Sequence, residues 1–288
     1  MSRRFSFSPP LNRPGSIASG LSALLILSAL LQTAARAGSP SVTPSASSAL
    51  HIRLGPDSIA CGITVPVPKA AGASRRKPGL IVWLHGGMGS QNREKGFEAH
   101  RALLPFVDPG AYYLCSPSAY RGQEWPTPQG IAHIDALIDY MTAHYAFDPA
   151  DINVVGVSDG NLGIIAYSLQ GKRELHRRVL ISSAPQLVLP LEALPGQTRF
   201  GTGSWDFLQG GRDRLFPPDQ VIPYLQQWEK LYPNAHLHYF PDGEHDFSFY
   251  SDQAAVLLKS LFSAEKPKGT GKPSPQKTQA LQKSPGKT

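Results

Sequence analysis

The sequence predicts an α/β protein in which helices cover both faces of a mostly parallel sheet of about eight strands. Strand-like and helix-like segments alternate from residue 49 onward, an order that is typical of parallel sheets. The run GLIVWL at residues 79–84 is apolar throughout, as in strands that are buried on both faces. No long insertion separates the segments, so we expect a single domain without a lid domain.

The expected strands are short runs rich in β-branched, aliphatic and aromatic residues. Pro66 places the second of them near a sheet edge, because proline cannot donate a hydrogen bond to a strand ladder. In chain order the strands are expected at residues 51–54, 63–67, 79–84, 111–115, 151–157, 178–182, 205–209 and 236–240.

The expected helices lie between these strands or after the last one, and show apolar residues at helical spacing. Ile134, Leu137, Ile138 and Met141 give the clearest example. The stretch at 184–204 is irregular and long enough only for a small flap. The helices are expected at residues 92–106, 129–146, 162–175, 217–231 and 252–263.

The N-terminal end differs from this core. Residues 1–37 contain four arginines, no acid and the apolar run IASGLSALLILSALL, which precedes the small-x-small pattern Ala35-Arg36-Ala37. These features are typical of a secretory signal peptide. An uncleaved anchor helix is the alternative, but the apolar run is shorter than a membrane span requires. We therefore expect an exported protein, periplasmic or secreted, without stable membrane insertion after cleavage.

The C-terminal end is a basic segment that cannot form a core. Residues 266–288 hold six lysines, four prolines and no acid, too little apolar surface to offset the entropy of ordering. We expect a disordered tail here, either solvated without a partner or in contact with an anionic surface. A disordered linker at 38–48 is expected to precede the folded domain at 49–265.

The basic net charge belongs to the two ends of the chain. The 288 residues carry 28 Lys and Arg against 21 Asp and Glu, a net charge of +7. The ends hold ten of the positive charges and no acid, so residues 38–265 keep 18 positive against 21 negative charges, a net of −3. The folded part therefore gives no reason to expect a nucleic-acid partner.

Ser158 lies in a G-x-S-x-G motif, GVSDG, between a strand pattern and a helix pattern. A serine hydroxyl becomes a good nucleophile only when a base takes its proton. A tight strand-to-helix turn exposes that hydroxyl, and Gly156 and Gly160 avoid the crowding that such a turn causes. An ordinary serine in a strand-to-helix turn is the alternative for this motif alone.

A glycine-rich segment, LHGGMG, follows the most apolar strand. Acyl transfer develops an oxyanion, which two backbone N–H groups usually stabilise. We expect these donors to be the N–H groups of Gly87 and Asp159, with Met88 as the alternate to Gly87. His85 is expected to brace the loop rather than to act as the base. A phosphate-binding loop is disfavoured, because no G-K-[ST] sequence follows.

The acid and the base are expected later in the chain, each just beyond a strand. GGRDRLFP places Asp213 there, and GEHDF places His245 after the last strand. His245 would take the Ser158 proton and return it to the leaving group, while Asp213 would fix the imidazole tautomer. The competing acids and histidines lie inside predicted strands or at a helix start; these are Asp206, Asp219, His236 and His238.

These motifs resemble those of the α/β-hydrolases, specifically the small lidless serine esterases of the carboxylesterase/phospholipase and dienelactone-hydrolase-like groups. The resemblance covers about residues 50–263 and rests on LHGGMG, GVSDG, GGRDRLFP and GEHDF. It implies an eight-stranded sheet, a triad of Ser158, Asp213 and His245, and neither a cofactor nor a metal. Asn161 departs from the pattern, since many relatives carry a glycine there.

The resemblance also bears on the two cysteines and on substrate contacts. It implies that the second and fourth strands are neighbours, so Cys61 and Cys115 either form a disulfide between them or remain buried thiols. Trp125 and Leu187 lie in loops expected on the same rim as Ser158. Both are candidates for substrate contacts, and ordinary packing is the alternative.

We expect hydrolysis of a carboxylic ester, small or carried on a polymer, through an acyl-enzyme intermediate. A serine peptidase of the prolyl-oligopeptidase type is one alternative, although those enzymes usually carry an added gating domain. A non-catalytic hydrolase-like protein that binds a polyanion or the cell envelope is another.

Overall fold

The computed structural model describes residues 47–54, 57–67, 76–87, 92, 94–119 and 125–263 of the chain. The expected signal peptide, most of the expected linker, Met88 and the basic tail lie outside these residues.

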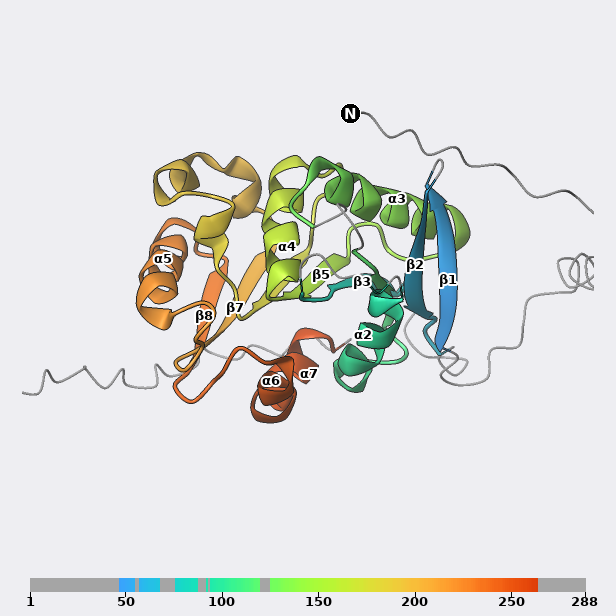
Figure 1. The fold of residues 1–288 in the computed structure, drawn as a ribbon. Coiled ribbons are helices and arrows are strands. Elements are labelled where there is room, and N and C mark those ends of the chain that lie inside the picture. The colour runs from blue at the N-terminus through green and yellow to red at the C-terminus, as the bar shows by residue number, and fades with distance from the viewer. Residues whose placement is uncertain are drawn as a thin grey trace, which may run out of the picture. The chain divides into compact units, whose positions relative to one another are not determined.

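Eight strands form one sheet in the order β1-β2-β4-β3-β5-β6-β7-β8 (Figure 1). β1 pairs with β2, and β2 with β4, in antiparallel orientation, whereas every other pair is parallel. The predicted fold class is therefore confirmed. The strands are β1 Ser47–Leu54, β2 Asp57–Thr64, β3 Gly79–Leu84, β4 Tyr112–Pro117, β5 Ile152–Val157, β6 Arg177–Ile181, β7 Ser204–Gly210 and β8 Ala235–Phe240.

Helices cover both faces of the sheet. α3, α4 and α5 lie on one face, and α2, α6 and α7 on the other (Figure 1). The helices are α2 Lys95–Leu103, α3 Pro128–His144, α4 Asp159–Gln170, α5 Pro218–Leu231, α6 Phe247–Gln253 and α7 Ala255–Leu261. Short 3₁₀ turns occur at η2 Leu104–Phe106, η3 Pro185–Leu187, η4 Leu191–Gly196 and η5 Thr198–Gly201.

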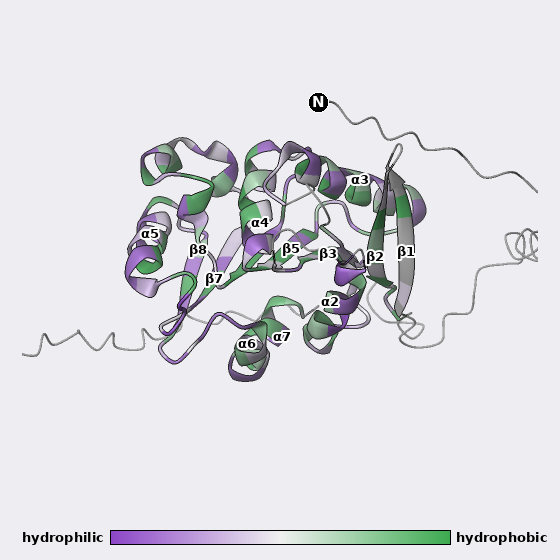
Figure 2. Ribbon diagram, viewed as in Figure 1, coloured by the Kyte–Doolittle hydropathy of each residue, from purple (hydrophilic) through white to green (hydrophobic). Residues whose placement is uncertain are grey.

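The central strand β3 explains why its sequence is apolar without interruption. Leu80, Val82 and Leu84 face the core beneath α3, α4 and α5, and Ile81 and Trp83 face the core on the opposite side. Each is at most 2% exposed, as the two-residue period of a strand between two helical layers requires. Figure 2 shows the same concentration of hydrophobic residues along the central strands.

Three segments differ from the sequence prediction. β1 begins at Ser47 rather than at residue 51, so residues 47–48 of the expected disordered linker belong to the sheet. The second strand is Asp57–Thr64 rather than residues 63–67, and it lies inside the sheet between β1 and β4. Pro66 lies beyond its end, because a residue without an N–H group cannot extend the ladder. The last helical segment is two helices, and the prediction missed α6, although Asp246 caps it through a hydrogen bond from the Ser248 N–H (3.0 Å).

The two cysteines are free thiols, both buried. The register pairs Ile63 with Cys115 and Cys61 with Pro117, so the two cysteines are not directly opposite each other across β2 and β4. Burial raises the pKa of the Cys115 thiol well above its ordinary value. The sequence left open either a disulfide or two buried thiols, and the structure has two buried thiols.

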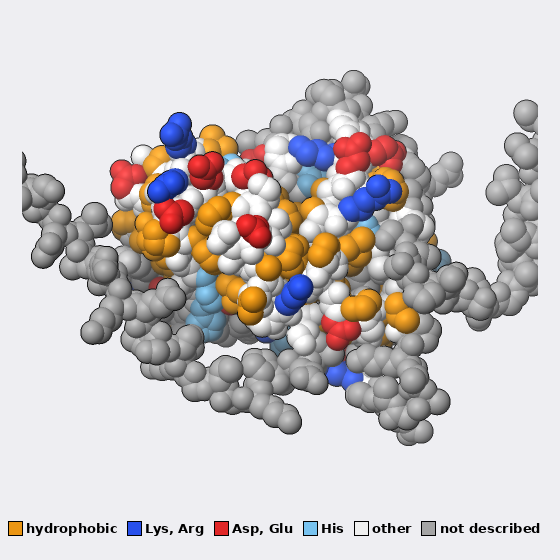
Figure 3. Space-filling model, turned by 90° about the horizontal axis from the view of Figure 1, so that it is seen from below, with side chains coloured by type: hydrophobic (Ala, Val, Ile, Leu, Met, Phe, Trp, Pro, Cys, Tyr) orange, Lys and Arg blue, Asp and Glu red, His pale blue; other side chains and the backbone are white. Residues whose placement is uncertain are grey.

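Figure 3 views the molecule from the side of α6 and α7 and shows hydrophobic and charged side chains interspersed over this face. Within the described ranges, no helix combines the length and the hydropathy that crossing a membrane demands.

Candidate active site

Ser158 occupies a strained turn between β5 and α4. β5 ends at Val157 and α4 begins at Asp159, which leaves Ser158 alone between them with φ +53° and ψ −117°. Few residues other than glycine adopt a positive φ, so the surrounding structure must hold this conformation. The Ser158 N–H donates to the Ile181 carbonyl (3.1 Å), and the Ser158 carbonyl accepts from the Asn161 N–H (3.0 Å).

The two glycines of the motif are required by contacts at this turn. A Cβ on Gly156 would lie 2.7 Å from the Gly160 carbonyl carbon, which confirms the expected crowding across the turn. A Cβ on Gly160 would overlap the carbonyl oxygen of Leu84 on the neighbouring strand β3. The first contact was expected from the motif, whereas the second depends on the order of strands in the sheet.

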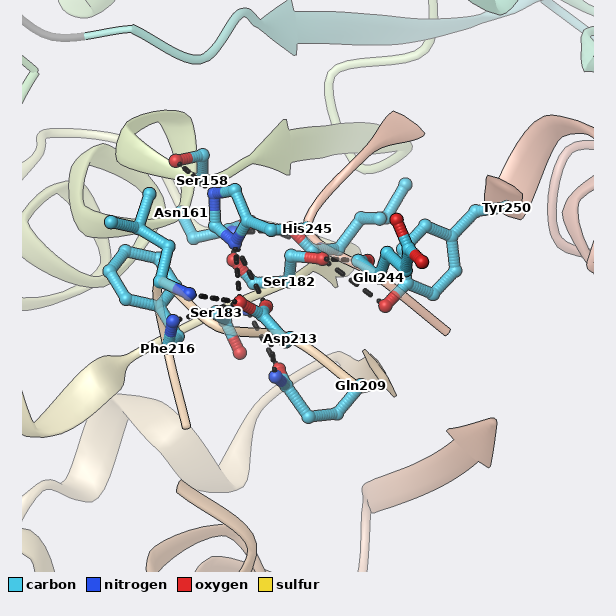
Figure 4. A network of polar contacts seen from close by, with 12 residues as sticks. Ser158, Asn161, Ser182, Ser183, Gln209, Asp213, Phe216, Glu244, His245 and Tyr250 are labelled. Carbon is cyan, nitrogen blue, oxygen red and sulfur yellow. Dashed lines mark hydrogen bonds and ion pairs between the residues drawn. The ribbon is translucent and has the colours of Figure 1, made fainter. Parts of the chain in front are cut away.

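The structure brings the side chains of Ser158, His245 and Asp213 together, as the sequence predicted (Figure 4). The Ser158 Oγ lies 2.8 Å from His245 Nε2. On the other side of the ring, His245 Nδ1 lies 2.8 Å from Asp213 Oδ2 and 3.0 Å from Oδ1. The three residues follow β5, β7 and β8, whose carboxyl ends meet at one edge of the sheet.

Asp213 is buried and held by several hydrogen-bond donors. Its Oδ1 accepts from the backbone N–H groups of Leu215 (3.0 Å) and Phe216 (2.8 Å). Burial alone would raise the pKa of Asp213, but the bonds from His245 and from these two backbone groups lower it below its ordinary value. The Gln209 side chain also donates to Oδ2 at 3.4 Å, and sequence analysis missed this residue.

The glycine-rich loop after β3 lies next to Ser158. A Cβ on Gly86 would lie 3.1 Å from the Ser158 Cβ, and Gly87 follows with φ +85°. Among the described residues, neither the Gly87 N–H nor the Asp159 N–H has a hydrogen-bond acceptor. Within this part of the chain, two backbone donors without an acceptor therefore flank the Ser158 turn, one in the loop and one at the start of α4.

His85 braces this loop from inside. The Ala119 N–H donates to His85 Nε2 (3.1 Å), so Nδ1 carries the hydrogen and donates to the Gly86 carbonyl (2.9 Å). Burial is the main cause that lowers the pKa of His85 to about 4, which keeps the ring neutral. These contacts agree with the expected role of His85 as a brace.

The expected pocket role of Trp125 is wrong. Trp125 is 3% exposed, and its indole N–H donates to the His85 carbonyl (2.9 Å) beneath the glycine-rich loop. Its ring therefore packs in the core, and it supports the loop rather than lining a pocket. Leu187 is 63% exposed in η3, where no described contact assigns it a role.

Asn161 joins the start of α4 to the end of β6. Its Nδ2 donates to the carbonyls of Ile181 (2.7 Å) and Ser182 (3.1 Å), and its Oδ1 accepts from the Ile181 N–H (3.2 Å). Ser182 has φ +51°, and its hydroxyl lies 3.1 Å from that of Tyr250 on α6 (Figure 4). A glycine at position 161 would lack the three side-chain bonds.

Another Asp–His pair lies away from Ser158. His238 Nε2 and Asp206 Oδ1 are 3.0 Å apart across strands β7 and β8, and no serine joins them in the described network. Within the described ranges, no group of three or more His, Cys, Asp or Glu residues is placed to hold a metal ion.

The contact between Gly160 and Leu84 makes a prediction about stability. Gly160→Ala should lower the free energy of unfolding by about 1–3 kcal/mol, because the added methyl group meets backbone that cannot move aside alone. Gly196→Ala is a matched control, since a Cβ there meets no atom within 4 Å. Urea unfolding of both variants measures the difference, and equal stabilities would contradict the described turn.

The lowered pKa of His85 makes a prediction about pH. The free energy of unfolding should fall as the pH decreases from 6.5 to about 4, because the unfolded chain binds a proton that the folded chain excludes. This shift corresponds to at most about 3 kcal/mol. His85→Gln should remove that part of the fall, as measured by urea unfolding at pH 4.5 and pH 7. The same fall in both proteins would show that His85 is not the group responsible.

No family model and no curated protein matches this chain, but many solved structures share its fold. A thermostable esterase is 14% identical with a TM-score of 0.57; the match covers 74% of this chain and 62% of the esterase. FphF, a fluorophosphonate-binding serine hydrolase of Staphylococcus aureus, is 11% identical with a TM-score of 0.60, over 77% of this chain and 100% of FphF.

Peptidases are also among the similar structures. The Pyrococcus horikoshii acylaminoacyl peptidase is 12% identical with a TM-score of 0.52, over 76% of this chain and 40% of the peptidase. The chain thus spans about three fifths of the thermostable esterase and two fifths of the peptidase. The topology and these likenesses show that the chain has the α/β-hydrolase fold.

Proposed function

We propose that this protein is a serine hydrolase that cleaves carboxylic esters through an acyl-enzyme intermediate. The observation that carries the proposal is the continuous hydrogen-bonded series from Ser158 through His245 to Asp213, with both links at 2.8 Å. Each side chain lies at the carboxyl end of a different strand, so the sheet positions all three.

The proposed reaction begins at the Ser158 hydroxyl. Its Oγ attacks the ester carbonyl carbon while His245 Nε2 takes the proton, and the buried Asp213 carboxylate stabilises the imidazolium that forms. The intermediate then expels the alcohol, which receives the proton from His245. Water attacks the acyl-enzyme in the same way, and the acid product leaves as Ser158 recovers its proton.

The negative charge of the intermediate requires donors on the other side of the reacting carbon. The N–H groups of Gly87 and Asp159 are the proposed pair, because both flank Ser158 and neither has an acceptor among the described residues. Asp159 also begins α4, whose N-terminal end favours negative charge. Neutral His85 supports the loop that carries Gly87 through both of its ring nitrogens. The proton transfer is therefore assigned to His245. Leu187, exposed in η3, remains a candidate contact for the apolar part of a substrate.

A peptidase is the second candidate, since acylaminoacyl peptidases share the fold. This chain corresponds to about two fifths of those proteins. Comparing a 4-nitrophenyl ester with the 4-nitroanilide of the same acyl group separates the two. Similar kcat/KM values for both would favour the peptidase.

Removal of the proposed nucleophile should abolish ester turnover. Ser158→Ala should lower kcat for 4-nitrophenyl acetate by at least roughly 10⁴-fold, and Asp213→Asn by a similar factor because it favours the wrong tautomer of His245. Ser260→Ala on the exposed surface of α7 is the serine control and should keep the wild-type rate. A wild-type rate no higher than that of Ser158→Ala would remove the proposal.

A further inference from the structure

Lys95 places a positive charge beside the glycine-rich loop. It is the first residue of α2, and its Nζ donates to the Gly87 carbonyl (3.2 Å). A Cβ on Gly87 would overlap the Lys95 Nζ, so the ammonium occupies the space that a side chain at position 87 would enter. A Cβ on Gly86, one residue earlier, would lie 3.1 Å from the Ser158 Cβ. The ammonium therefore contacts the loop at Gly87, the residue after the one that lies against Ser158.

The position of Lys95 is not explained by helix stability. A cation in the first turn of a helix is opposed by the helix dipole, which favours acids at that end. The acid in this turn, Glu98, accepts a hydrogen bond from Asn92 Nδ2 (2.8 Å) instead of pairing with Lys95.

Nor does an ion pair explain it. Among the described residues, no carboxylate pairs with Lys95, whereas Arg173 lies 2.7 Å from Asp139 and Arg76 lies 2.8 Å from Asp151. An ammonium has three N–H donors, and the Gly87 carbonyl accepts from one of them. Among the described residues, two of its donors and its charge thus have no partner and are available to a ligand.

The neighbouring titratable group does not add to or cancel this charge. His85 is neutral at ordinary pH, and the charge of Lys95 helps to lower its pKa after burial, which is the larger cause. Beside the Gly87 donor, His85 therefore leaves the charge of Lys95 unchanged, and the bond to Gly87 holds that charge close to the loop. The other proposed donor belongs to Asp159, an acidic residue at the start of α4.

We propose that Lys95 binds a carboxylate of the substrate, so that the preferred substrates are half-esters of dicarboxylic acids. This inference rests on the proposed function. With the scissile carbonyl oxygen between the Gly87 and Asp159 N–H groups, a carboxylate a few bonds away on the acyl chain reaches the two unused Lys95 donors. The charge pair forms next to the reacting carbonyl and favours an anionic acyl chain over an apolar one of equal length.

The test compares two esters that differ only in this charge. The full chain is assayed with 4-nitrophenyl hydrogen glutarate and with 4-nitrophenyl pentanoate, which has a methyl group in place of the carboxylate, and spontaneous hydrolysis is subtracted. The wild type should prefer the glutarate in kcat/KM. Lys95→Gln should lower kcat/KM for the glutarate by roughly tenfold, as expected for a partly exposed charge pair, and for the pentanoate by less than threefold.

Two variants and one condition sharpen the result. Lys95→Arg should keep most of the preference, because it keeps the charge. Lys259→Gln, which removes an exposed lysine of α7, should leave both rates unchanged. Higher ionic strength should reduce the preference in the wild type and not in Lys95→Gln, since salt screens exposed charges.

An equal loss for both esters in Lys95→Gln would overturn the inference and assign Lys95 to support of the loop. No loss of kcat/KM for either ester in Lys95→Gln would overturn it too, since the preference would then not depend on Lys95. If the wild type cleaves neither ester, the proposed function itself fails, and the inference fails with it.

Discussion

The backbone of Ser158 is held in the left-handed region, and the arrangement of the site depends on this one constraint. At φ +53° the residue leaves β5 and enters α4 without a connecting loop, so its hydroxyl projects from the sheet edge. The conformation persists because Gly156 and Gly160 have no side chains. The two ends of the turn can therefore lie close together, and the start of α4 can approach β3. A side chain at Gly160 would push α4 away from the Leu84 carbonyl and move Ser158 with it.

A second strained residue lies beside the first. Ser182, at the end of the neighbouring strand β6, has φ +51°, and Asn161 holds its carbonyl while the Ser182 hydroxyl contacts Tyr250. Asn161 thereby connects α4 to the end of β6, and Ser182 connects the end of β6 to α6. α6 is the helix that follows the His245 loop. The strain at both turns is compensated by buried hydrogen bonds, which hold the geometry of the site.

Much of this arrangement could be predicted from the sequence, because its signals are local. The strand runs, the G-x-S-x-G turn, and Asp213 and His245 beyond their strands each depend on a few adjacent residues. Other features depend on partners far along the chain. Gln209 reaches Asp213 through side-chain geometry, Asn161 bonds to a strand twenty residues later, and the burial of Trp125 follows from packing beneath the loop. No local pattern distinguishes such a buried tryptophan from one that lines a pocket.

The central claim is that His245 activates the hydroxyl of Ser158 and of no other serine. Reaction of the full chain with a fluorophosphonate, followed by mass spectrometry of its peptides, tests this claim directly. The account predicts a single phosphonate on the peptide that carries Ser158, and loss of the adduct in His245→Gln. A phosphonate on Ser182 or Ser183, or no adduct at all, would contradict it.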